Sequence, residues 1–199
     1  MIDKLALIFG SKTKAQEMVF LLHNVKNVVR QGFYPSELGR VEEFCKNNNL
    51  YLVKSKFKVL VTNDHIYSNK GLRIDLDDTR EGMYFTYISK DEKTALLASY
   101  DELTGNDYEL GLVLGYPSCC VQFFCRHFNE KNPDLQLPAT NLFTNLTARN
   151  QDCVLLSHFP CSSDCSESIR IAEHYAALLK SIDLQRYQKM ITLLQFPSQ

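Results

Sequence analysis

Hydrophobic residues recur at helical spacing along the first part of the chain. Apolar side chains three and four residues apart predict a helix over about residues 12–30, which Gly32 ends. Tyr34-Pro35-Ser36 predicts the start of a second helix, with Ser36 as its N-cap. Cys45 lies on the apolar stripe of that helix, and we expect it in the core because free cysteine packs as a small hydrophobe. A helical N-terminal lobe over residues 1–49 is consistent with this pattern.

Between Leu50 and Tyr100 the pattern changes to short runs that are rich in Val, Ile, Tyr and Phe and are separated by turn residues. Such runs predict the strands of a small, mostly antiparallel sheet. They cover residues 50–54, 57–62, 72–76 and 83–88. Thr94–Tyr100 fits either a hairpin partner of the last run or a helix.

Helical spacing returns in the second half of the chain. Asn106 is placed to cap a helix over Asp107–Leu114. Apolar positions from Cys165 to Leu179 recur every three and four residues, and a last helix is expected over Leu184–Gln195. The whole pattern predicts a single α+β domain over residues 1–199, with a small, mostly antiparallel sheet and a helical C-terminal half.

Composition and charge narrow the class of protein only a little. The chain has 199 residues, 45% of them hydrophobic, and a net charge of −1, which gives no case for a strongly basic nucleic-acid surface. The apolar run Leu5–Phe9 is too short for a signal peptide, and no later run reaches membrane-spanning length. We therefore expect a cytoplasmic protein without membrane contact. In that compartment seven cysteines indicate metal ligands, catalytic thiols or core residues rather than disulfides.

Two short segments combine an aromatic residue, a proline and cysteines. Gly115–Cys120 reads Gly-Tyr-Pro-Ser-Cys-Cys, and His158–Ser168 reads His-Phe-Pro-Cys-Ser-Ser-Asp-Cys-Ser-Glu-Ser. Proline suits the first position of a helix, so both cysteine pairs are predicted in a first helical turn, where the helix dipole favours the thiolate. If the two helix starts converge, four thiolates meet at one point. These candidate ligands are Cys119, Cys120, Cys161 and Cys165.

Four thiolates suit either an iron–sulfur cluster or a zinc ion. Structural zinc sites usually separate the two ligands of a pair by two to four residues, whereas Cys119 and Cys120 are adjacent and diverge by about 100° on a helix. A cluster is larger and accepts neighbouring cysteines on different irons. The spacing therefore favours an iron–sulfur cluster of the 4Fe-4S type, with zinc as the alternative.

These two segments resemble the motifs of an uncharacterised, largely archaeal prokaryotic family of unknown function. The family motifs are Gly-Tyr-Pro-x-Cys-Cys and His-x-Pro-Cys-x-x-x-Cys-x-x-Ser, which this chain shows at residues 115–120 and 158–168. The resemblance covers roughly the second half of the chain. It implies a shared function at these residues and names no reaction.

His158 and Ser168 are the candidate catalytic residues. His158 precedes the second cysteine pair and fits a metal ligand, a general acid or base, or a histidine bonded to backbone. Ser168, one helical turn after the pair, fits a partner of a sulfur atom or of a bound ligand, or an ordinary polar helix residue. Cys125 and Cys153 are expected to be packing residues, and Cys153 is the reserve ligand.

Three functions remain open at this point. The favoured one is an enzyme that uses its metal–thiolate centre for redox or sulfur-handling chemistry on a small-molecule substrate. The second is a structural zinc site in a binding module, with RNA as a partner of lysine side chains near one strand, although the net charge disfavours strong nucleic-acid binding. Those lysines are Lys54, Lys56 and Lys58. The third is a thiol oxidoreductase in which Cys161 or Cys120 attacks. The oligomeric state is not predicted.

Overall fold

A three-stranded antiparallel sheet forms the centre of the N-terminal half in the computed structural model, which describes residues 1–61, 71–129 and 131–195. β5 (Tyr84–Ser89) is the middle strand, with β1 (Val28–Phe33) on one side and β2 (Tyr51–Lys54) on the other. Side chains alternate between the two faces of each strand, so both faces of β5 are available for packing against helices.

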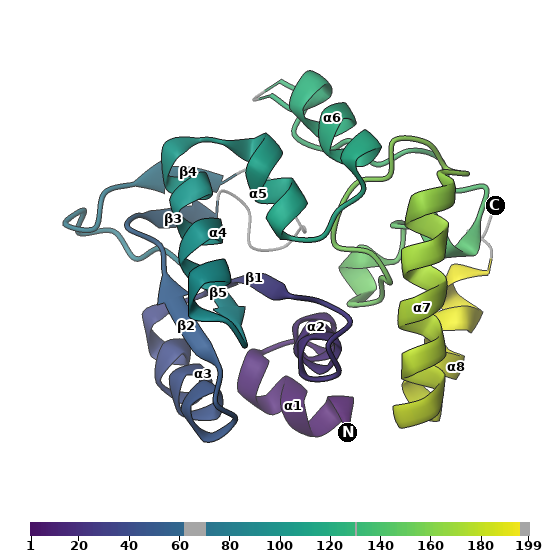
Figure 1. The fold of residues 1–199 in the computed structure, drawn as a ribbon, viewed down its shortest axis with the longest axis horizontal. Coiled ribbons are helices and arrows are strands. Elements are labelled where there is room, and N and C mark those ends of the chain that lie inside the picture. Colours follow the sequence, from purple (N-terminus) through teal and green to yellow (C-terminus); the bar gives the residue numbers. More distant parts are fainter. Residues whose placement is uncertain (62–70, 130, 196–199) are drawn as a thin grey trace.

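Helices cover both faces of this sheet (Figure 1). Val29 and Ile88 belong to the larger hydrophobic core, whereas the neighbouring Val28 and Tyr87 belong to a smaller core on the opposite face. The larger core lies beneath α1 (Ile2–Phe9), α2 (Lys12–Leu22) and α3 (Pro35–Asn47). The smaller core lies beneath α4 (Glu92–Thr104) and α5 (Asp107–Val113).

A second, two-stranded antiparallel sheet pairs β3 (Lys58–Val61) with β4 (Gly71–Ile74). An isolated bridge between Val59 and Met83 attaches this hairpin to the chain just before β5. The second sheet therefore extends from the first one rather than forming a layer of its own.

The C-terminal part is helical. The loop before α7 contains two short 3₁₀ turns, η1 (Leu142–Thr144) and η2 (Arg149–Gln151). In Figure 1, α7 and α8 lie side by side at one end of the molecule, and α6 lies between them and the sheet. The helices are α6 (Ser118–His127), α7 (Ser166–Ile182) and α8 (Leu184–Leu194).

The two halves of the chain share the larger core. The rings of Phe20 in α2 and Tyr175 in α7 stack with centroids 4.3 Å apart. The Asp152 carboxylate accepts hydrogen bonds from the backbone N–H groups of Lys12 and Thr13, which begin α2. A carboxylate at this position satisfies unpaired N–H groups and complements the helix dipole. Packing and capping together fix the C-terminal loop against the N-terminal helices.

Much of the predicted pattern is confirmed. The fold is α+β, and the four predicted strands correspond to β2, β3, β4 and β5. The Asn106 side chain accepts from the Glu109 N–H at the start of α5, as expected for a capping residue. The last two helices lie close to their predicted bounds.

Two local predictions are wrong, and one alternative that the sequence left open is resolved. The helix expected over residues 12–30 ends at Leu22, because Asn24 turns the chain with φ 59° and the following residues pair with β5 as a strand. Residues 1–49 are therefore not all helical. Thr94–Tyr100 is part of α4, which Asp91 caps, and does not form a hairpin. The second helix begins at Pro35 with Tyr34 in the N-cap position, so Ser36 lies inside it.

Among the helices within the described ranges, none combines the length and the apolar composition needed to cross a membrane.

The contact between α5 and α6 can be tested at Gly111. A Cβ atom at Gly111 would lie 2.7 Å from Cγ2 of Val121, whereas one at Gly39 in α3 would meet nothing within 4 Å. We expect Gly111→Ala to destabilise the protein by about 1–3 kcal/mol through overpacking. Gly39→Ala should stabilise it by about 0.5–1 kcal/mol, because alanine has the higher helix propensity. Urea unfolding of both variants measures the difference. Equal stabilisation of the protein by the two substitutions would mean that α6 can move away from α5.

Candidate metal centre

The first cysteine pair lies at the start of α6, as predicted. Gly115 turns the chain after α5 with φ 80°, a conformation that glycine adopts without strain. Pro117 occupies the N-cap position of α6, and Cys119 and Cys120 are the second and third residues of the helix. The contact between Gly111 and Val121 sets the distance between α5 and α6. The helix start and this close contact determine where the two thiols point.

The second cysteine pair lies in a different setting from the one predicted. α7 begins at Ser166 with Cys165 as its N-cap, so Cys161 belongs to the preceding loop and not to a first helical turn. The prediction that Pro160 begins a helix is wrong, because Phe159 and Pro160 are buried in the loop. The Cys165 N–H donates to the Ser162 carbonyl oxygen, 3.2 Å away. This local turn brings Cys161 back toward Cys165.

All four sulfur atoms converge at one point. The Sγ atoms of Cys119, Cys120, Cys161 and Cys165 lie within 4.8 Å of one another. Sγ of Cys120 is 3.9 Å from that of Cys119 and 3.6 Å from that of Cys165, and Sγ of Cys119 is 3.8 Å from that of Cys165. The convergence predicted for the two segments is therefore present, although one member of the second pair comes from a loop.

Polar hydrogens point at one of these sulfurs in particular. The Cys161 N–H donates to Sγ of Cys120 at 3.3 Å, and Oγ of Ser168 lies 3.2 Å from the same sulfur. Nε2 of His158 is 2.9 Å from Oγ of Ser168. If the Ser168 hydroxyl donates to a Cys120 thiolate, its oxygen is left to accept from His158 Nε2–H. This chain of three side chains would stabilise negative charge on Cys120.

The pKa values of the clustered thiols are shifted in different directions. Burial raises the pKa of Cys120 well above its usual range, and burial together with hydrogen bonds to Cys165 and Cys119 raises the pKa of Cys161 to about 11. Burial alone would also raise the pKa of Cys165, but hydrogen bonds from Ser168, Cys120 and Cys161 lower it to about 7. Of these three thiols, that of Cys165 loses its proton most readily, and deprotonation of the other two needs a nearby cation.

His158 is not part of the group of possible ligands. Its side chain is buried, and burial, with lesser effects of Lys26 and Arg149, lowers its pKa to about 3. The imidazole is therefore uncharged at neutral pH. Its ring packs against Tyr116 with centroids 4.9 Å apart. Its contact with Ser168 allows it to act on Cys120 through the serine, and the catalytic roles suggested for His158 and Ser168 remain predictions.

A buried ion pair supports the loop that carries His158. Nζ of Lys26 lies 2.7 Å from Oε1 of Glu17 and donates to Oγ of Ser157 at 2.9 Å. Both charged side chains are almost fully buried, with 3% and 8% of their surfaces exposed. The Ser157 hydroxyl is also 3.4 Å from the Tyr116 hydroxyl. The pair thus links α2 to both segments that supply cysteines.

The remaining cysteines divide into two groups. Cys45 and Cys153 are buried in the larger core, as expected, whereas Cys125 is exposed, and the prediction that it is a packing residue is wrong. None of these three belongs to the group of possible metal ligands found among the described residues.

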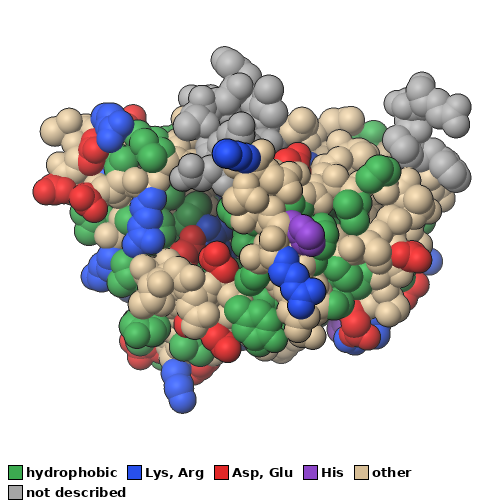
Figure 2. Space-filling model, turned by 90° about the horizontal axis from the view of Figure 1, so that it is seen from above, with side chains coloured by type: hydrophobic (Ala, Val, Ile, Leu, Met, Phe, Trp, Pro, Cys, Tyr) green, Lys and Arg blue, Asp and Glu red, His purple; other side chains and the backbone are tan. Residues whose placement is uncertain are grey.

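The lysine-bearing segment offers less than its sequence suggested for nucleic-acid binding. Lys58 is buried, and its ammonium group donates to the carbonyl oxygens of Asp78 and Arg80. Lys54 pairs with Glu42 at 3.1 Å. On the face drawn in Figure 2, basic and acidic side chains of the described residues are interspersed rather than gathered by sign. This arrangement lacks the basic stripe that phosphate backbones favour.

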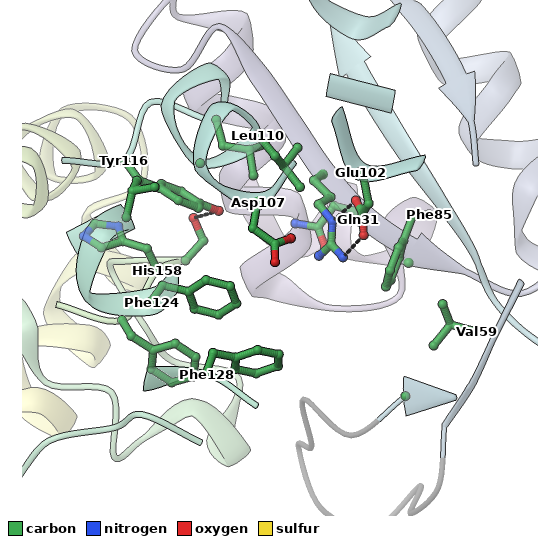
Figure 3. Close-up of a pocket in the computed structure, with 18 of the residues that line it drawn as sticks. Gln31, Val59, Phe85, Glu102, Asp107, Leu110, Tyr116, Phe124, Phe128 and His158 are labelled. Atoms are coloured by element: carbon green, nitrogen blue, oxygen red, sulfur yellow. Dashed lines mark hydrogen bonds and ion pairs between the residues drawn. The ribbon is translucent and has the colours of Figure 1, made fainter. Parts of the chain in front are cut away.

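A cavity of about 610 Å³ lies beside the sulfur cluster. Cys120, His158 and Tyr116 line one end of it, and residues of β1, α4 and the second sheet line the other. Figure 3 shows Tyr116, His158, Phe124 and Phe128 on one side, facing Phe85 and Glu102 across the opening. No local pattern in the sequence predicts this site, because its walls come from segments far apart in the chain. The one available signal was Arg and Phe residues within predicted strands.

The fold and the site together define an α+β protein with a four-cysteine cluster that could hold a metal ion. The chain belongs to DUF483, a family of proteins of unknown function, whose match covers residues 95–196. The match includes both cysteine segments. No curated protein and no solved structure matches the chain.

The buried pair of Lys26 and Glu17 can be tested by removing one charge. We expect Lys26→Met to cost about 3–5 kcal/mol of unfolding free energy, because it leaves the Glu17 carboxylate buried without its partner. Lys12→Met is the matched control: Lys12 pairs with Asp3 at the surface, where 39% and 69% of the side chains are exposed. It should cost less than about 1 kcal/mol. Urea unfolding of each variant gives both values, and similar costs would show that Lys26 does not support the loop.

Proposed function

We propose that the four cysteines bind a single tetrahedrally coordinated metal ion, and that this ion is zinc. The observation that carries the proposal is the spacing of the sulfur atoms. Tetrahedral zinc lies about 2.3 Å from each thiolate, which puts two thiolates about 3.8 Å apart. The three distances between the sulfurs of Cys119, Cys120 and Cys165 are 3.6, 3.8 and 3.9 Å.

This spacing favours one ion over an iron–sulfur cluster. In a four-iron cluster each cysteine bonds a different iron, so the sulfurs lie outside a cube of iron and sulfide and are farther apart than the ligands of one ion. The four sulfurs here lie within 4.8 Å of one another, which leaves no room for such a cube without movement of both segments. Adjacent cysteines therefore suit a single ion when one member of the second pair, Cys161, approaches from a loop.

A structural role follows from the set of donors. Four thiolates close the coordination sphere of zinc, and closed spheres are typical of structural sites. The ion would join the start of α6 to a loop 41–46 residues further along the chain. Since Cys120, His158 and Tyr116 also line the cavity, the ion would hold one wall of a small-molecule binding site in place.

Redox or sulfur-handling chemistry on a small molecule is the second candidate function. The observation that favours it is the position of Cys120 on the cavity wall, where a bound substrate would lie beside the centre. Cys119 is exposed and is the ligand most easily exchanged. An open coordination position is typical of catalytic metal sites. In this second case the metal is iron, and inorganic sulfide accompanies it.

Metal analysis separates these candidates. We expect anaerobically purified protein to contain about one zinc ion per chain and no acid-labile sulfide, with Co²⁺ substitution producing the intense visible absorption of a tetrahedral thiolate site. Cys161→Ser should lose most of the bound metal. Cys125→Ser is the matched control, because Cys125 lies outside the cluster on the same helix as Cys119 and Cys120. Stoichiometric iron and sulfide would contradict the zinc proposal, and equal metal in both variants would remove the ligand assignment.

The hydrogen bond from Ser168 to Cys120 has its own test. Partners of metal ligands typically contribute a factor of about 10–100 to metal affinity, so Ser168→Ala should weaken zinc binding by about that factor. Ser166→Ala changes an exposed serine of the same helix and should leave the affinity unchanged. Competition with a chromophoric chelator measures both. Unchanged affinity in Ser168→Ala would mean that the hydroxyl does not act on the thiolate.

A further inference from the structure

The cavity beside the sulfur cluster has a charge of its own. Among the residues that the structure describes, four cationic side chains line it, against two carboxylates, although the chain as a whole carries a net charge of −1. The carboxylates belong to Glu102 and Asp107, and the cationic side chains are Lys14, Arg30, Arg73 and Arg149. The excess of positive charge is therefore a local feature of this cavity and favours an anionic occupant.

Two of the arginines, at the end away from the cysteines, each lie against a phenylalanine ring. The Arg30 guanidinium lies 3.8 Å from the ring centroid of Phe85, and that of Arg73 lies 3.8 Å from the ring centroid of Phe57. The two rings meet edge to face with centroids 6.0 Å apart. Arg30 also pairs with the Glu102 carboxylate, as the dashed lines of Figure 3 show. A guanidinium fixed in this way needs little further ordering to bind an anion.

Aromatic rings form another part of the lining. Phe124 and Phe128 stack with ring centroids 4.5 Å apart and 20° between their planes, and Figure 3 shows both rings on the side of the cavity opposite Phe85. Aromatic walls of this kind favour planar rings, which gain from offset stacking as well as from burial. The volume of about 610 Å³ is within the range of small-molecule sites.

We propose that this cavity binds a small aromatic anion, with its ring between Phe124 and Phe85 and its charged group near Arg30 and Arg73. A zinc ion with four thiolates carries a formal charge of −2, so an anionic group is repelled from the Cys120 end and belongs at the arginine end. Asp107 lies between the two ends with its carboxylate facing the opening (Figure 3). This carboxylate opposes anion binding and limits the affinity.

The position of Asp107 provides a test in which binding becomes stronger. The probe is 8-anilinonaphthalene-1-sulfonate, titrated by fluorescence into the purified, metal-loaded protein, and its neutral analogue 1-anilinonaphthalene is the reference. Asp107→Asn should lower the Kd of the sulfonate about fivefold, the order expected for one unit charge several ångströms away in a partly solvated site. Arg73→Gln should raise that Kd about fivefold. Neither change should alter the Kd of the neutral probe.

Matched controls identify the cavity as the place of binding. Glu109→Gln removes the same charge from the same helix as Asp107, and Arg170→Gln removes an arginine from α7; neither residue lines the cavity. Both controls should leave the Kd of the sulfonate unchanged. Equal affinity for the two probes, or equal effects of Asp107→Asn and Glu109→Gln, would overturn the proposal.

The outcome for this cavity is separate from the outcome for the metal. Zinc is measured on the same samples that are titrated. Sulfonate binding that responds to Asp107 and Arg73 in a protein without zinc would contradict the metal proposal and support the cavity proposal. Stoichiometric zinc, together with sulfonate binding that does not depend on these charges, would support the metal proposal and contradict the cavity proposal.

Discussion

Four sulfur atoms held within 4.8 Å are the constraint on which the rest of this structure depends. Four thiolates at these distances repel one another strongly. A cation at their centre would remove this repulsion. The turn at Gly115, the close contact of Gly111 with Val121 and the buried loop before α7 are the features that bring the sulfurs this close.

Several groups around the cysteine cluster favour negative charge on the sulfur atom of Cys120. Lys26 lies buried near His158 and, together with burial, keeps the imidazole uncharged. An uncharged imidazole has a single N–H group, which suits a role as donor to Ser168 and leaves the serine hydroxyl for Cys120. The Cys161 N–H adds a second donor to the same sulfur. Negative charge on Cys120 would thus be stabilised by groups from the loop before α7 and from α7 itself.

The cysteine cluster and the cavity share one wall but differ in chemistry. At the shared end the groups are sulfur, imidazole and the Tyr116 ring, whereas the far end is built from arginine–phenylalanine stacks. A centre that fixes the start of α6 also fixes Phe124 and Phe128, because these residues lie on that helix. Ligand binding in the cavity and metal binding at the cysteines are therefore expected to stabilise the same arrangement of α5 and α6.

Local sequence patterns determined the α+β class, most of the strands, the cap at Asn106 and the identity of the four clustered cysteines. These features can be predicted because turn residues, helical spacing and paired cysteines are signals that lie within a few neighbouring residues. The strand at Val28–Phe33, the loop position of Cys161 and the cavity were decided by the tertiary structure. Val28 and Val29 fit a helix or a strand equally well, and pairing with β5 selects the strand. Sulfur spacing and cavity charge depend on distances between segments more than forty residues apart, which no local pattern encodes.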